Sequence, residues 1–385
     1  MPRKFVILSR TRGAIESFGT RDLQAFGAAP PVVREQSLTD AEAASIAAEP
    51  EVELIVPAMR TRLIEPLAAD AGAGTSDWSL QATGAATSKF DGRRVKVAVL
   101  DTGIDSAHPA FADVDILERD FSGTGDGDRN GHGTHCAGTI LGRDVGQRIG
   151  VARGVSKLLV GKVLGDDGGG DSSMIFEAMQ WAMMGGANVI SMSLGFDFPG
   201  MVAEQVKAGW PAELATSNAL EAYRGNLRMF DAIMATNGAL GPFGEGALVI
   251  AAAGNESKRD QNPAWRIAAS LPAAASDVIP VAAVGRSGSG LKVAGFSNTM
   301  ALVSGPGVDV TSAWPGGGLN TISGTSMACP HVAGLAALWW QSIEKDGRRA
   351  TPLNVKAALI RSATHEGLEG PDFEVDYGQG LAKAP

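Results

Sequence analysis

The chain has 385 residues, of which 44% are hydrophobic and 19% charged, enough for a large buried core. A net charge of −9 argues against nucleic-acid or anionic-membrane partners, and the two cysteines, Cys136 and Cys329, exclude a disulfide-rich scaffold. No stretch is apolar enough for a signal peptide or a membrane span, so we expect a cytoplasmic protein unless an export segment was removed. We also expect a monomer.

The first 70 residues predict a small α+β domain. Residues 5–8, "FVIL", read as a short buried strand, and residues 37–50 read as a helix that begins at a capping Ser or Thr and ends at a proline. Residues 51–59 alternate between apolar and polar side chains, as a half-buried strand does. The composition of residues 68–77, rich in Ala, Gly and Asp, indicates a linker to the rest of the chain.

Residues 71–385 predict an α/β domain in which apolar strands alternate with helices. We expect a mostly parallel central sheet with helices on both faces, and a functional site beyond the carboxyl ends of the strands. The expected strands cover residues 94–101, 157–164, 188–195, 247–255 and 278–285, and a helix covers residues 173–186.

The segment between residues 196 and 246 predicts a further helix. Its apolar side chains recur at steps of three and four and therefore form one core-facing stripe. The stripe consists of Leu220, Tyr223, Leu227, Phe230 and Met234.

The stretch "SGTSMACPH", residues 323–331, places a serine at the start of a long apolar helix. Pro330 favours a helix start nearby, because proline is tolerated in the first turn. Ser326 is then either an ordinary N-cap or a nucleophile at the positive end of the helix. Helical spacing places Cys329 beneath Ser326 and turns His331 away from it, so a base for Ser326 must come from elsewhere.

His132 is the best candidate for that base. It stands between two glycines in "NGHGTHCAGTI", residues 130–140. Its spacing from His135 would also suit zinc ligation, but no H-E-x-x-H motif is present and no third ligand is evident nearby. Asp101 ends the apolar strand "VAVLD", where a carboxylate could orient an imidazole or simply form a turn.

Four motifs, "VAVLDTGID", "NGHGTHCAGTI", "AAAGN" and "SGTSMACPHVAG", occur in this order, and together they resemble the subtilisin-like serine proteases (subtilases). The order Asp, His, Ser distinguishes that family from other triad hydrolases. The resemblance implies a serine endopeptidase with Asp101 as orienting carboxylate, His132 as base and Ser326 as nucleophile. It also implies that Asn255 stabilises the oxyanion.

The resemblance further implies a cleft that binds an extended peptide and prefers an apolar side chain at its main pocket. Glu256 would admit a basic side chain there if it entered the pocket, but a solvated loop acid is the favoured interpretation, because Glu is rarely buried. No cofactor is required, and a calcium site common in the family is in doubt because Ala110 stands where relatives carry Asp; Asp126 and Asp128 are weak substitutes. The implied substrate-binding residues are Gly168, Gly169, Gly170, Ser193, Leu194, Gly195, Ala252, Ala253, Gly254 and Ser270.

Two regions extend the resemblance. Residues 1–70 resemble the family's inhibitory propeptide, which implies an intramolecular inhibitor that is cut off between about Pro66 and Ser76; a permanent N-terminal domain is the alternative. Residues 196–246 read as an enlargement relative to compact family members. Both cysteines are expected to be buried free thiols beneath the site.

Three other functions stay open at this point. A transpeptidase or cyclase would pass the acyl group to an amine instead of water. A non-catalytic binding module would keep the fold without turnover. A metal hydrolase would need the histidines as ligands.

Overall fold

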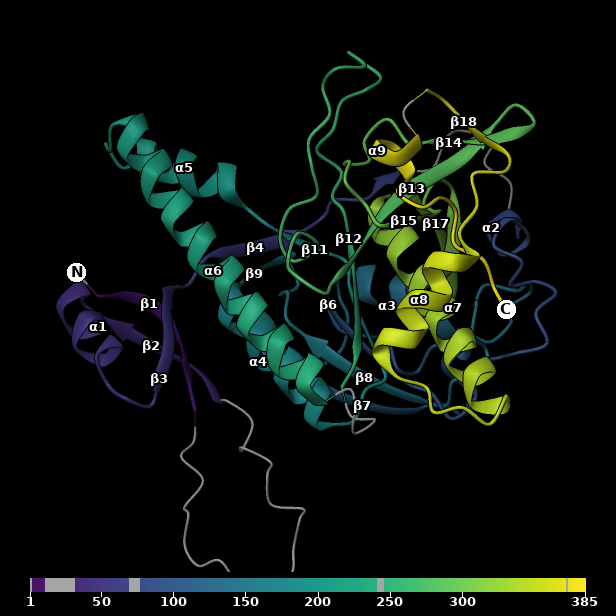
Figure 1. The fold of residues 1–385 in the computed structure, drawn as a ribbon, viewed down its shortest axis with the longest axis horizontal. Coiled ribbons are helices and arrows are strands. Elements are labelled where there is room, and N and C mark those ends of the chain that lie inside the picture. The colour runs from purple at the N-terminus through teal and green to yellow at the C-terminus, as the bar shows by residue number, and fades with distance from the viewer. Residues whose placement is uncertain (1, 11–31, 69–76, 241–245, 372) are drawn as a thin grey trace, which may run out of the picture.

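The computed structural model describes residues 2–10, 32–68, 77–240, 246–371 and 373–385. In this part of the chain a nine-stranded sheet forms the centre of the molecule (Figure 1). Its strands run in the order β18-β14-β13-β12-β10-β6-β8-β7, and β15 also pairs with β13. Only the pairing of β13 with β14 is antiparallel. The bounds are β6 Lys96–Asp101, β7 Asp115–Asp120, β8 Lys157–Lys162, β10 Val189–Met192, β12 Leu248–Ala252, β13 Ile279–Ser287, β14 Gly290–Val293, β15 Val303–Pro306 and β18 Leu368–Glu369.

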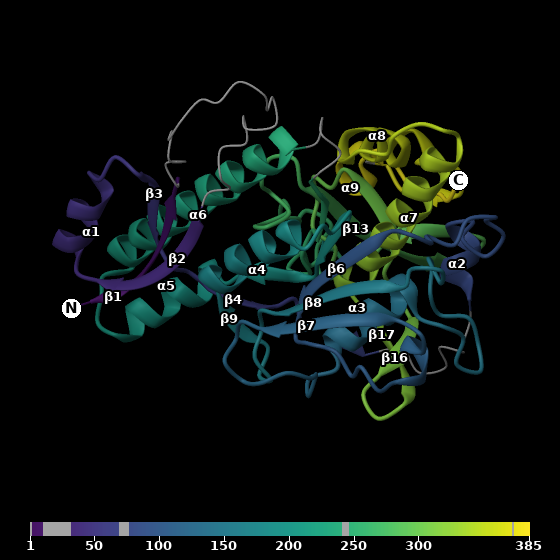
Figure 2. The ribbon, with the colours of Figure 1, turned by 90° about the horizontal axis from the view of Figure 1, so that it is seen from below.

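Helices cover both faces of this sheet, as predicted (Figure 2). In β6, Val97 and Val99 face one apolar core, whereas Ala98 and Leu100 face the other. Such double burial explains why the strand reads as a continuous apolar run. The first core is completed by α3, His132–Leu141, α7, Thr325–Lys345, and α8, Pro352–Ser362; the second by α4, Ser172–Met184, and α6, Ala212–Leu240.

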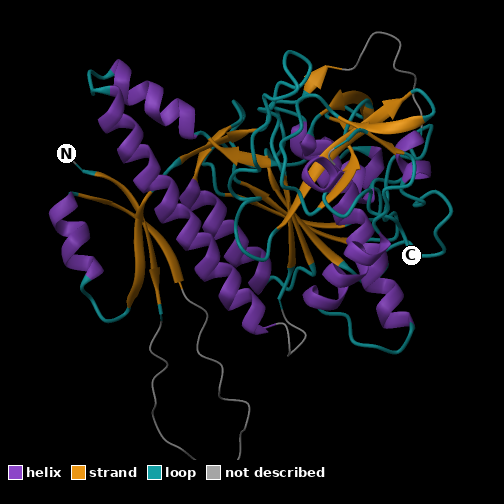
Figure 3. Ribbon diagram, turned by 45° about the horizontal axis from the view of Figure 1, so that its top comes forward, coloured by secondary structure: helices purple, strands orange, loops and turns teal. Residues whose placement is uncertain are grey.

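Shorter elements surround the sheet (Figure 3). Two three-stranded sheets run in the orders β11-β4-β9 and β16-β17-β5. No helix in the described ranges is long and apolar enough to cross a membrane. The bounds are β4 Arg60–Leu63, β5 Leu67–Ala68, β9 Gly169–Asp171, β11 Leu194–Phe196, β16 Val310–Trp314, β17 Gly318–Ser323, α2 Trp78–Ala82, α5 Phe198–Lys207, α9 Phe373–Tyr377 and a 3₁₀ turn, Pro109–Phe111.

The N-terminal residues form a separate α+β unit that lies against α4 and α6 (Figure 2). Its antiparallel sheet has the order β2-β1-β3 and carries α1. The helix begins in a capping box, in which Thr39 and Glu42 satisfy each other's backbone N–H groups. The predicted linker falls almost wholly on residues 69–76, which lie outside the described residues. The bounds are β1 Arg3–Ser9, β2 Val32–Leu38, α1 Asp40–Ala47 and β3 Val52–Pro57.

Two sequence-based predictions need correction here. The strand expected over residues 188–195 divides into β10 and β11, because β11 leaves the main sheet to pair with β4. The stripe expected to face the core is buried only toward its end: Phe230 and Met234 are buried, but Leu220 is 48% exposed. The reason is the length of α6, whose N-terminal half extends past the sheet beside α5 (Figure 1).

Candidate active site

Asp101 and His132 meet at one end of the central sheet. Asp101 is the last residue of β6, and its Oδ1 lies 2.7 Å from His132 Nδ1. The same oxygen accepts the backbone N–H of Thr102, and both side chains are about 1% exposed. A buried carboxylate on Nδ1 fixes the orientation of the imidazole and leaves Nε2 available for proton transfer.

The glycines beside His132 allow its close approach to the strand end. Gly131 precedes α3 with a φ of 101°, and a Cβ there would come within 2.6 Å of the Trp314 ring. A Cβ on Gly133 would lie 2.2 Å from the carbonyl oxygen of Gly103. Any larger residue at either position would therefore push His132 away from Asp101.

Asp128 holds the strand end and the helix start together. Its Oδ1 accepts the Thr102 hydroxyl at 3.0 Å and the Gly131 N–H at 2.8 Å. Its Oδ2 accepts both the N–H and the hydroxyl of Thr134. The Thr102 hydroxyl in turn accepts the N–H of Gly133. Asp128 is thus a positioning residue, and its oxygens are already occupied by donors rather than free for calcium.

Ser326 lies at the start of α7 but is not its N-cap. The helix begins at Thr325 with Gly324 as N-cap, so Ser326 is its second residue and its N–H has no partner within the helix. The Ser326 side chain is fully buried. No hydrogen bond joins it to His132 in the described structure; its hydroxyl instead makes long contacts of 3.4 Å with the carbonyl oxygens of Ile64 and Ser193.

Pro330 lies in the second turn of α7, not in the first as predicted. Because proline has no N–H, the carbonyl four residues earlier, that of Ser326, loses its helical donor. Two side chains replace that donor: Ser193 Oγ at 3.1 Å and Cys136 Sγ at 3.4 Å. The carbonyl group of Ser326 is therefore held by side chains that lie outside α7.

Asn255 is oriented by the same helix start. Its Oδ1 accepts both the N–H and the hydroxyl of Thr325 at 2.9 Å. This leaves Nδ2 pointing to the other side, where it donates to the carbonyl of Glu65 at 3.0 Å. Asn255 Nδ2 thus already serves as a donor to a peptide carbonyl at the site.

A segment of the chain itself occupies the cleft beside Ser326. Strand β4 lies between β9 and β11 and pairs antiparallel with both. Arg62 is opposite Gly195 on one side and Gly169 on the other, and the N–H of Leu63 donates to Gly168. Beyond the serine, β5 pairs with β17. We call residues 60–68 the tail segment.

Ile64 is the tail residue nearest Ser326. This residue is only 4% exposed. Its side chain lies 3.5 Å from the place where a Cβ on Gly195 would be, so the glycine leaves room for it. Its carbonyl oxygen is the one that Ser326 Oγ approaches. The amide of Asn255 donates to the next carbonyl, that of Glu65.

Comparison with known proteins agrees with this geometry. Residues 92–380 match the Subtilase family. The chain belongs to the subtilase family. It is 34% identical over 270 residues to Subtilisin-like protease 6 of Trichophyton verrucosum, covering 69% of this chain and 57% of that protein. It is 31% identical over 316 residues to Subtilisin-like serine protease Pen ch 13 of Penicillium rubens, covering 78% and 67%. The chain thus spans about 57–67% of the length of these curated relatives.

The substrate-binding residues expected in this subtilase fall into three groups. The glycines 168–170 and residues 193–195 flank the tail segment. Ala252, Ala253 and Gly254 are buried at the end of β12, and the N–H of Gly254 donates to Thr325. Ser270 is half-buried; its carbonyl closes a turn with Ala274, and no hydrogen bond joins it to the tail segment in the described structure.

Both cysteines of the subtilase are buried free thiols. Burial raises the pKa of Cys329 to about 11, and burial together with the Asp101 charge raises the pKa of Cys136. Cys329 contacts Ser191 Oγ and the carbonyls of Met192 and Ile250. Neither thiol is therefore ionised near neutral pH, so neither is an activated nucleophile.

The histidine pair that the sequence suggested for zinc, His132 and His135, does not share a cluster of potential ligands in the described residues. His135 Nε2 lies against the carbonyls of Val310 and Asn320, and His331 Nδ1 against that of Met327. Within the described ranges, the one cluster of potential ligands is Asp101, His132 and Cys136. This set does not suit calcium, which takes six to eight oxygens. Its nitrogen, sulfur and oxygen donors are of the kind that zinc takes, but Asp101 and His132 are hydrogen-bonded to each other at 2.7 Å, and burial raises the pKa of the Cys136 thiol.

Several residues that hold the site in place could not be assigned a role from the sequence. Asp128 accepts the hydroxyl of Thr102, 26 residues earlier, and Thr325 donates to Asn255, 70 residues earlier. Only their residue types, near glycine-rich helix starts, hinted at such roles. Nothing in the sequence marked Ile64 as a residue of the site, because an apolar residue next to a short strand normally indicates a core position.

Proposed function

We propose that this subtilase is a serine endopeptidase that acts on peptide or protein substrates. The observation that carries the proposal is the tail segment: a peptide strand already lies in the cleft with the Ile64 carbonyl beside Ser326 Oγ. Strand addition of this kind binds any extended backbone, with side-chain pockets adding selectivity.

The proposed reaction uses the residues in fixed roles. His132 Nε2 takes the proton of Ser326 as Oγ attacks the substrate carbonyl, and Asp101 stabilises the imidazolium that forms. Asn255 Nδ2 and the unpaired N–H of Ser326 stabilise the oxyanion, since both donors are held in place before the reaction. His132 then protonates the leaving amine, and water hydrolyses the acyl-enzyme with His132 again as base.

Active-site labelling tests the proposal directly. A fluorophosphonate probe should label the wild type but neither Ser326→Ala nor His132→Ala, and both variants should lose peptide cleavage. Ser342→Ala, near the C-terminal end of the same helix, is the matched control and should behave as wild type. Labelling of Ser326→Ala at the wild-type rate would overturn the assignment.

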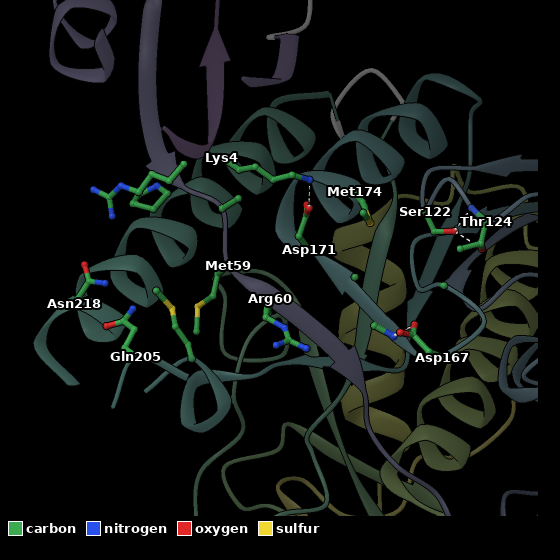
Figure 4. Close-up of a pocket in the computed structure, with 17 residues that line it drawn as sticks. Lys4, Met59, Arg60, Ser122, Thr124, Asp167, Asp171, Met174, Gln205 and Asn218 are labelled. Atoms are coloured by element: carbon green, nitrogen blue, oxygen red, sulfur yellow. Dashed lines mark hydrogen bonds and ion pairs between the residues drawn. The ribbon is translucent and has the colours of Figure 1, made fainter. Parts of the chain in front are cut away.

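We also infer that the N-terminal unit is an intramolecular inhibitor. Two interactions support its docking: Asn226 on α6 donates to the carbonyl of Pro57 at 3.0 Å, and Lys4 forms an ion pair with Asp171 (Figure 4). The tail segment then blocks the cleft. While the segment is bound, Asn255 Nδ2 is occupied by the carbonyl of Glu65 and Ser326 Oγ faces the carbonyl of Ile64, so no other peptide can use these groups.

The site supports cutting at Ile64–Glu65, upstream of the interval between Pro66 and Ser76 that the sequence suggested. N-terminal sequencing of the wild type and of Ser326→Ala tests whether self-cleavage occurs and at which of these positions. We expect a new N-terminus at Glu65 in the wild type and an intact chain in Ser326→Ala. An intact wild type would support a permanent domain instead, and a cut in both proteins would rule out self-processing.

A further inference from the structure

The tail segment carries two exposed basic side chains. In β4, Thr61 and Leu63 are buried, whereas Arg60 and Arg62 are exposed on the alternate positions. Successive side chains of a strand point to opposite sides, so both arginines share one side of the bound peptide. Counting back from Ile64, they stand two and four positions before it.

Acidic residues of the 196–246 segment meet these arginines. Arg62 lies 3.4 Å from Asp197 Oδ1, and Arg60 forms an ion pair with Glu204 on α5. Glu256, outside that segment, is a more distant partner of Arg62 at 3.9 Å. Figure 4 shows Arg60 on its strand at a hollow of about 600 Å³, which also includes Gln205 and Asn218 on α5 and α6.

Asp197 is held by contacts within its own helix as well as by the tail segment. It is the N-cap of α5, where its Oδ1 accepts the N–H of Gly200 at 3.0 Å. A Cβ on Gly200 would lie 2.0 Å from the Asp197 carboxylate, so this arrangement needs glycine. The N–H of Asp197 also donates to the carbonyl of Arg60, which continues the pairing of β11 along the bound strand.

We propose that Asp197 and Glu204 form two acidic subsites that select substrates with arginine or lysine two and four positions before the residue whose carbonyl faces Ser326. This inference rests on the proposed endopeptidase function and names its substrate class. The 196–246 segment thereby supplies the acidic side chains nearest to both arginines. Both ion pairs are partly exposed, so each subsite favours a basic residue by about 2- to 5-fold.

Competition between peptides in one solution tests the proposal with the full chain. Acetyl-Arg-Thr-Arg-Leu-Ile p-nitroanilide is mixed with versions carrying alanine at the first, the third or both arginine positions, and consumption is followed by mass spectrometry. All peptides compete for the same open clefts, so the ratios of kcat/KM do not depend on how much of the tail segment has been released.

The wild type should prefer arginine at each position by about 2- to 5-fold, less at high salt. Glu204→Gln should remove the preference at the first position only, and Asp197→Asn, which keeps a capping side chain, at the third only. Glu213→Gln, an exposed acid of α6 that forms no ion pair with either arginine, is the matched control and should change neither.

Two results would overturn the inference alone: equal consumption of all peptides by the wild type, or unchanged ratios in Glu204→Gln and Asp197→Asn. Absence of any cleavage, together with absence of fluorophosphonate labelling, would overturn the proposed function and this inference with it.

Discussion

Ser193 Oγ donates a hydrogen bond to the backbone carbonyl of Ser326 at 3.1 Å. The bond exists because Pro330 removes the helical N–H that would otherwise reach this carbonyl. A proline in the second turn of α7 thus ties the peptide of Ser326, the proposed nucleophile, to the residue between β10 and β11.

Replacing Ser193 by alanine should loosen that peptide. Cys136 remains as a weaker donor, so we expect a loss of about 1 kcal/mol in the free energy of unfolding and a fall in kcat of about 5-fold. Urea unfolding and peptide turnover measure the two effects, with Ser342→Ala as the control. A kcat equal to that of the wild type would show that Ser193 does not position Ser326.

Asp128→Asn should affect both stability and activity. Asparagine would point an N–H₂ group at donors that now meet a carboxylate, and buried donors without acceptors are costly. We expect a loss of about 2–4 kcal/mol in the free energy of unfolding and slower turnover through misplacement of His132. Asp126→Asn, an exposed neighbour, should resemble the wild type in thermal unfolding; equal Tm values for both variants would contradict the role given to Asp128.

Cys136 should make the enzyme sensitive to organomercurials. Its Sγ lies 3.8 Å from His132 Nδ1, so a metal atom on it would displace the imidazole. Activity should be lost in the wild type and in Cys329→Ala but retained in Cys136→Ala. Equal inhibition of Cys136→Ala would place the effect elsewhere. Iodoacetamide should react slowly with the folded protein, because burial raises both thiol pKa values.

Buried histidines should destabilise the fold at acid pH. Burial lowers the pKa of His135 to about 3 and that of His331 to about 4. Below the ordinary value of 6.5 the unfolded chain binds protons that the folded chain does not, so stability falls as pH drops from 6.5 toward 4. For His331 the loss is about 2 kcal/mol at pH 5.

His331→Asn removes this titration but keeps a donor near the carbonyl of Met327. In a Ser326→Ala background, which prevents autolysis, urea unfolding at pH 7 and pH 5 should show a smaller pH effect for His331→Asn than for the parent. An unchanged difference would mean that His331 is already charged in the folded state.

The four motifs could be read from the sequence because each is local. Asp101 follows an apolar strand, and His132, Asn255 and Ser326 each stand in a short glycine-rich stretch at an element's edge, where backbone geometry restricts the residue types. The parallel sheet followed from the continuous apolar strands, since burial on both faces leaves that pattern.

The tertiary structure alone decided what surrounds those residues. Nothing in "RTRLI" indicates that Ile64 would lie beside Ser326, because strand addition uses backbone groups that every sequence has. Asp197 and Glu204 read as ordinary surface acids until the fold brought them to Arg62 and Arg60. Local patterns determine elements and motifs, but contacts between distant segments depend on packing that no single stretch encodes.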